Sequence, residues 1–124
     1  MQINDKLMKN YVKQPVILYE GNTLGDITLN DSVANYQYIE ILYHDNNDIF
    51  NSVKIENANG KLVQFYGGIF ARPHFYQRNG GATINGNAIT FESSITIDFV
   101  YNNYPQITEN NNEVFTITKV LGYK

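Results

Sequence analysis

The chain of 124 residues has the length of one domain, and its 43% hydrophobic and 17% charged residues are typical of a globular chain. A net charge of −3 without a basic cluster argues against nucleic-acid binding. Because the chain has no cysteine, disulfides, thiolate catalysis and Cys-ligated zinc are excluded, and no apolar run approaches the length of a membrane span.

The first fifteen residues differ from the rest of the chain. They can form a turn or two of helix that places Leu7, Met8 and Tyr11 on one side, before a proline closes it. They can equally form an exposed arm that docks on another protein through these three residues. We therefore divide the chain into an N-terminal arm or anchor, residues 1–15, and a β-domain, residues 16–124.

Beyond the arm, apolar and polar residues alternate with a period of two, which indicates β-strands with one buried face. Ile39 and Ile41 share one such face, and Ile95, Ile97 and Phe99 share another. The expected strands are 16–19, 26–29, 36–43, 49–56, 61–66, 69–77, 88–92, 94–101 and 113–121.

Turn residues agree with a chain of short strands. Asn-Gly pairs between apolar segments predict antiparallel hairpins with type I′ turns, in which both central residues have positive φ. A Gly-Gly pair inside an apolar run predicts a turn, or a bulge where a strand changes sheets. The Asn-Gly pairs are Asn59-Gly60, Asn79-Gly80 and Asn85-Gly86, and the Gly-Gly pair is Gly67-Gly68.

These patterns predict an all-β fold. About nine short strands, joined by turns at regular spacing, are typical of an antiparallel β-sandwich or jelly roll. To this we add the short N-terminal arm or helix, residues 1–15.

Candidates for catalysis or metal binding are few. His44, Asp45 and Asp48 can in principle hold a metal ion, but the calcium-loop pattern is missing and an ordinary solvated turn explains them. Glu40, Glu56, Glu92 and Asp98 are expected on solvent faces, where a paired glycosidase-type arrangement is not indicated. No nucleophile, phosphate-loop or dinucleotide motif is found. We expect no catalytic residue, no metal and no cofactor, and therefore no enzyme.

Contact residues for a ligand or a subunit are better indicated. Arg72, His74 and Tyr76 share a face if their strand runs straight, and the proline among them favours an edge position; ordinary surface is the competing interpretation. Tyr101 and Tyr104 flank an Asn-rich loop. Aromatic rings and amides together make adaptable polar contact surfaces, and they also suit sugars, whose apolar face stacks on a ring.

The order of several segments resembles a known family. The segments are Leu18-Tyr-Glu-Gly21, Gly25-Asp-Ile-Thr-Leu29, Asn35-Tyr36 running into Ile39-Glu-Ile-Leu-Tyr43, and the ending Phe115-Thr-Ile-Thr-Lys-Val-Leu-Gly-Tyr123. Together they resemble a β-rich module of tail-fibre, baseplate and minor structural proteins of tailed bacteriophages, mainly those of Gram-positive hosts. Residues 61–87 carry no matching motif.

The resemblance implies a virion protein, made in the bacterial cytoplasm, that attaches or decorates. It implies frequent homotrimers and partners among other virion proteins or host cell-wall carbohydrate, and it brings no catalytic residues. The short lead before the module suggests either a free-standing head-fibre, decoration or adaptor subunit anchored by its arm, or an excised domain. Two alternatives remain: a carbohydrate-binding module of another system, and a small jelly-roll enzyme with His44 or His74 beside a carboxylate.

Overall fold

A computed structural model describes residues 14–101, 103–111 and 114–124. The arm, including the anchor candidates Leu7, Met8 and Tyr11, lies outside the described residues apart from its last two. Nine strands and one 3-10 turn, Val33–Asn35, make up the regular structure of the described part. The strands are β1 (Val16–Leu24), β2 (Ile27–Thr28), β3 (Tyr38–His44), β4 (Phe50–Glu56), β5 (Leu62–Ala71), β6 (His74–Asn85), β7 (Ala88–Val100), β8 (Gln106–Asn111) and β9 (Thr116–Tyr123).

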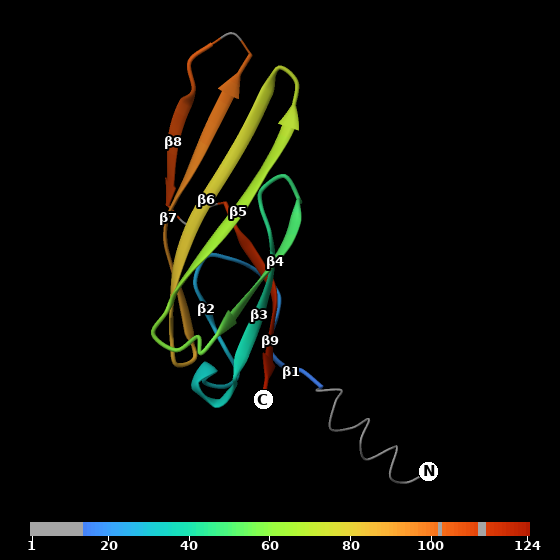
Figure 1. The fold of residues 1–124 in the computed structure, drawn as a ribbon, viewed down its shortest axis with the longest axis vertical. Helices are drawn as coiled ribbons and strands as arrows, with labels where there is room; N and C mark the ends of the chain where they lie inside the picture. Colours follow the sequence, from blue (N-terminus) through green and yellow to red (C-terminus); the bar gives the residue numbers. More distant parts are fainter. Residues whose placement is uncertain (1–13, 102, 112–113) are drawn as a thin grey trace, which may run out of the picture.

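The strands form two antiparallel sheets (Figure 1). The four-stranded sheet has the order β1-β9-β3-β4. The five-stranded sheet has the order β2-β7-β6-β5, with β8 paired to the other end of β7. The prediction of an all-β sandwich of about nine strands is therefore confirmed. Among the described residues, no helix is long and apolar enough to cross a membrane.

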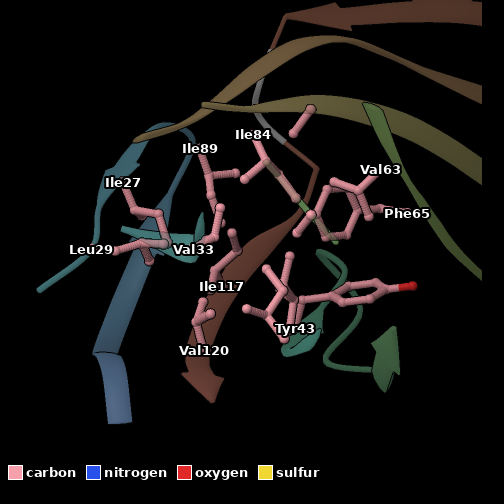
Figure 2. Close-up of a cluster of buried hydrophobic side chains, with 14 of the residues drawn as sticks. Ile27, Leu29, Val33, Tyr43, Val63, Phe65, Ile84, Ile89, Ile117 and Val120 are labelled. Carbon is pink, nitrogen blue, oxygen red and sulfur yellow. The ribbon is translucent and has the colours of Figure 1, made fainter. Parts of the chain in front are cut away.

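The hydrophobic core lies between the two sheets, at the end of the molecule where they overlap (Figure 2). Alternate residues of β3 point into it, as their period predicted: Ile39, Ile41 and Tyr43 are buried. Phe65 of the opposite sheet packs edge-on against Tyr43, with ring centroids 4.7 Å apart. Burial of these side chains is the main source of stability, because each removes apolar surface from water.

The strand assignment differs most from the sequence prediction at three places. The segment 69–77, expected to be one strand, is a hairpin whose turn at Arg72 and Pro73 joins β5 to β6. Arg72 therefore does not share a strand face with His74 and Tyr76, and the proline occupies a turn rather than an edge strand. The two segments expected at 88–92 and 94–101 are one strand, β7, and β8 was not predicted.

Only one of the three Asn-Gly pairs forms a hairpin turn. Gly86, with φ +61°, follows Asn85 at the turn between β6 and β7, but Asn87 does not have the positive φ that a type I′ turn requires. The pair at 59–60 lies where the chain passes from β4 in one sheet to β5 in the other. The pair at 79–80 lies inside β6.

The Gly67-Gly68 pair is neither a turn nor a sheet change. Both residues lie inside β5, and their register with β6 is uninterrupted. A Cβ on Gly67 would lie 2.7 Å from the carboxylate Oδ2 of Asp45. The glycine is therefore needed so that a side chain of the β3–β4 loop can approach the backbone of β5.

Candidate functional site

One half of the five-stranded sheet extends beyond the rest of the molecule (Figure 1). We call this part the blade; it comprises residues 66–71 of β5, 74–80 of β6, 93–100 of β7 and 106–111 of β8. Its two hairpin tips meet, because Tyr101 N donates a hydrogen bond of 3.0 Å to Pro73 O. The C-terminus lies at the opposite end of the molecule.

The outer face of the blade is apolar. Opposed residues of neighbouring antiparallel strands share a face, and here Phe70 is opposed to Phe75, Phe75 to Phe99, and Ile97 to Ile107. The rings of Phe75 and Phe99 lie 5.9 Å apart. Phe70 and Ile107 are 70% and 71% exposed, so these side chains lie on the surface of the single chain. Tyr66 and Ile95 extend the same face.

The exposure of this face contradicts the sequence prediction of a buried face for Ile95, Ile97 and Phe99. A bulge in β7 explains it: between Phe91 and Ser94 the register with β6 shifts by one residue, which reverses the side chains that follow. Phe91 is buried in the core, whereas beyond the bulge Ser94 takes the inward position and the apolar residues point outward. The sequence therefore carries a face patterned for burial that this chain alone does not bury.

The inner face of the blade is polar. His74 Nδ1 lies 2.9 and 3.0 Å from the two carboxylate oxygens of Asp98, and the His74 ring stacks on Tyr76 at 5.3 Å. The guanidinium of Arg78 also lies over the ring of Tyr76, 5.1 Å from its centroid. Asp98, expected on a solvent face, is thus partly buried, with its carboxylate within hydrogen-bond distance of a histidine ring.

Buried Asp45 joins the blade to the four-stranded sheet. Its carboxylate is fully buried and accepts hydrogen bonds from Asn47 N, Ile49 N and Gly68 N at 2.9, 3.1 and 2.9 Å. The guanidinium of Arg78, only 6% exposed, lies 3.8 Å away. The prediction of a solvated turn at residues 44–48 is therefore wrong for Asp45. This residue is buried, and its carboxylate accepts hydrogen bonds from the backbone of the turn.

A neighbouring tyrosine completes this junction. The Tyr43 hydroxyl accepts a hydrogen bond from Tyr66 N and donates one to Tyr66 O, at 3.1 and 3.2 Å. Burial raises the pKa of Tyr43, since the ionised form would be taken out of water. Tyr43 and Asp45 together satisfy backbone groups of Tyr66 and Gly68 on the edge strand β5, groups that would otherwise be open to pairing with another chain.

The candidate contact residues all belong to the blade or its tips, but on different surfaces. His74 and Tyr76 lie on the inner face. Arg72 lies in the β5–β6 turn, and Tyr101 and Tyr104 lie at the β7–β8 tip, 74% and 84% exposed. The sequence interpretation missed the outer face, although its alternation was visible, because an apolar face was taken to be an internal one.

A hollow of about 400 Å³ lies beside the edge of the blade at β5. Four aromatic residues, two amides and no lysine, arginine, aspartate or glutamate line it. The lining residues are Ile49, Asn51, Tyr66, Gly67, Gly68, Ile69, Phe70, Phe75, Tyr76 and Gln77. His74 and Asp98, the pair that an enzyme would use for proton transfer, do not line this hollow.

The described residues contain no group of three His, Cys, Asp or Glu side chains placed to hold a metal ion. His44 Nδ1 lies 3.6 Å from Asp48 Oδ1 and 2.7 Å from Asp45 O. These contacts account for the arrangement of the loop.

Comparison of the chain with models of protein families, with curated proteins and with solved structures finds no match.

Proposed function

We propose that the protein is a structural subunit of a bacteriophage particle, of the tail-fibre, baseplate, head-fibre or decoration kind, that assembles with copies of itself. In this role its blade contributes to assembly and to attachment at a host surface. The uncovered apolar outer face of the blade carries the proposal. The resemblance of the sequence to β-rich modules of tailed bacteriophages supplies the biological setting.

The size of the outer face favours a large, stable contact. The face has seven apolar residues, and the exposed fractions of the six that are exposed correspond to about 600 Å² of surface, the upper end of what a monomer leaves in one patch. A standard interface buries about 800 Å² on each partner, which this face and its polar rim can supply. The residues are Tyr66, Phe70, Phe75, Ile95, Ile97, Phe99 and Ile107.

A second copy of this chain is the partner that fits best. Two sheet faces pack on one another at about 10 Å with interdigitating side chains, as the two sheets of this domain already do. On β6, Gln77 is opposed to Ile97 and Asn79 to Ile95, and both amide side chains are uncharged. The register opposes Glu109 of β8 to Ile95, so the charge on this face is confined to its β8 edge, and copies can meet over β6 and β7 without like-charge repulsion. We infer a homotrimer, the arrangement that the resemblance implies, in which the outer faces of three copies meet around a common axis.

The two ends of the molecule suit a displayed subunit. The hairpin tips, with Arg72, Tyr101 and Tyr104, lie at the end of the molecule farthest from the C-terminus and from the beginning of β1 (Figure 1). If residues 1–15 anchor the chain to another particle protein, the tips point away from that protein and toward a host surface.

Analytical ultracentrifugation tests the proposal. We expect the wild-type chain to sediment as a trimer at micromolar concentration. The double variant Ile95→Lys/Ile107→Lys should sediment as a folded monomer, because two charges on the outer face would be buried on association. Ile17→Lys, which places a charge on an equally exposed isoleucine of β1, is the matched control and should remain a trimer.

A second measurement addresses attachment. We expect the wild-type chain to cosediment with phage particles or with cell walls of Gram-positive bacteria. A wild-type chain that stays monomeric at all concentrations and binds neither material would overturn the proposal.

A further inference from the structure

The hollow at the β5 edge of the blade has a distinctive lining. The rings of Phe70 and Phe75 lie side by side, with centroids 6.4 Å apart. Tyr66 adds a third exposed ring, and Asn51 and Gln77 place amides at the same hollow. Its volume of about 400 Å³ is in the range of small-ligand sites.

Two glycines, Gly67 and Gly68, contribute to the lining of the hollow. Gly68 has φ +151°, and a Cβ there would meet the carbonyl oxygen of Tyr76. A Cβ on Gly67 would meet Asp45. Neither position can hold a side chain without distortion, so both residues contribute only backbone to the lining of the hollow.

We propose that this hollow binds a neutral saccharide, with a pyranose ring stacked on Phe70 or Phe75 and its hydroxyls paired with the amides of Asn51 and Gln77. The inference rests on the proposed attachment role of the blade and names the ligand class of its β5 edge. The apolar C–H face of a pyranose matches an aromatic ring, while its hydroxyls can donate to and accept from amides.

Charge and hydrogen bonding favour a saccharide over other ligands. An anionic or cationic ligand would find no opposite charge in the lining. A lipid chain would remove the amides from water without replacing their hydrogen bonds, which costs free energy. An added peptide strand would need the edge groups of β5, but Tyr66 N and Gly68 N already donate to Tyr43 and Asp45.

The hollow and the proposed assembly face share Tyr66, Phe70 and Phe75, so the two proposals together require a contact between copies that is centred on the far strands of the blade. The hollow lies at β5, whereas Ile95, Ile97 and Phe99 belong to β7 and Ile107 to β8, on the other side of the blade. A contact between copies that is centred on β7 and β8 leaves the β5 edge accessible.

NMR titration of the wild-type chain with chitotriose and with maltotriose, two neutral trisaccharides, tests the site. We expect saturable shifts of the amide signals of Gly67, Gly68 and Gln77 with at least one of them. Phe70→Ala and Phe70→Leu should both weaken binding about tenfold, because leucine restores apolar volume but not the flat ring. Phe50→Ala, which removes a phenylalanine ring that is 69% exposed but does not line the hollow, is the matched control and should bind as the wild type does.

Three outcomes would overturn the inference: no saturable shifts with either sugar, binding by both Phe70 variants that is as tight as that of the wild type, or a change in sedimentation as the only effect of Phe70→Ala. The last would make the hollow part of a contact between copies. A monomeric wild-type chain that binds a trisaccharide through Phe70 would support the site while contradicting the assembly. The two proposals are thereby separated.

Discussion

The carboxylate of Asp45 lies 3.8 Å from the guanidinium of Arg78, and both side chains are buried where the β3–β4 loop meets the blade. Three backbone N–H groups also donate to Asp45, whereas Nε and Nη1 of Arg78 have no hydrogen-bond partner among the described residues. The carboxylate therefore has more hydrogen-bond partners than the guanidinium does. Arg78 depends on Asp45 for charge compensation.

We expect Asp45→Ala to lower the free energy of unfolding by about 3–5 kcal/mol, because it leaves a buried guanidinium without a counter-charge. Urea denaturation measures the change. Asp48→Asn, in the same loop but exposed, should change the free energy of unfolding by less than about 1 kcal/mol. Equal effects of the two substitutions would show that Asp45 does not organise this junction.

Gly67→Ala should destabilise the protein by about 1–3 kcal/mol, because the new methyl group would lie 2.7 Å from Asp45 Oδ2. Gly81→Ala is the matched control in the same sheet, since its nearest contact would be an ordinary 3.7 Å. In an Asp45→Ala background the cost of Gly67→Ala should fall, as the clashing carboxylate is gone. Additive costs in the double variant would contradict this explanation.

Tyr43→Phe should lower the free energy of unfolding at neutral pH by about 1–2 kcal/mol, since Tyr66 N and Tyr66 O lose their hydrogen-bond partner. Thermal or urea unfolding near pH 7 gives this difference, with the wild-type chain as reference.

The same pair predicts a pH dependence. Burial raises the pKa of Tyr43 above its ordinary value of 10.0, so the stability that this shift contributes is fully present below pH 10.0 and is lost as the pH rises toward the folded-state pKa. The difference between wild type and Tyr43→Phe should therefore be constant below pH 10.0 and shrink above it. The pKa values of Tyr36 and Tyr123, also raised by burial, affect both proteins equally and cancel. Parallel stability curves up to strongly alkaline pH would contradict the shift.

Phe91 and Phe99 lie on one strand on either side of the bulge, 6% and 38% exposed. Phe91→Ala should cost about 3–5 kcal/mol because it leaves a cavity in the core. Phe99→Ala, measured at a concentration where the chain is monomeric, should cost less than about 1 kcal/mol and should instead weaken association. Similar costs for both in the monomer would place Phe99 in the intramolecular core.

Much of the fold could be predicted from the sequence because local patterns decide it. The period of two at Ile39 and Ile41 reflects a strand with one face on the core, and the structure buries both residues. The division at residues 69–77 could not be predicted, because an apolar run with a proline fits an edge strand as well as a tight turn. The role of Gly67 could not be predicted either, because Asp45, the residue that a Cβ on Gly67 would meet, is distant in sequence.

The candidate site was only partly foreseen. Arg72, His74, Tyr76, Tyr101 and Tyr104 do lie on the blade and its tips, but the partnership of His74 with Asp98 joins residues that are 24 positions apart. Asp45 looked like any aspartate in a polar turn until its burial and its contact with Gly68 were visible.

By itself the sequence determined that the chain forms antiparallel strands with apolar faces, because alternation acts through the local geometry of a pleated strand. Only the tertiary structure decided which faces are inside. One bulge near Ser93 reverses β7, so the apolar face of Ile95, Ile97 and Phe99, patterned like a core, lies on the surface. A register shift has this effect because opposite sides of a sheet are one residue apart.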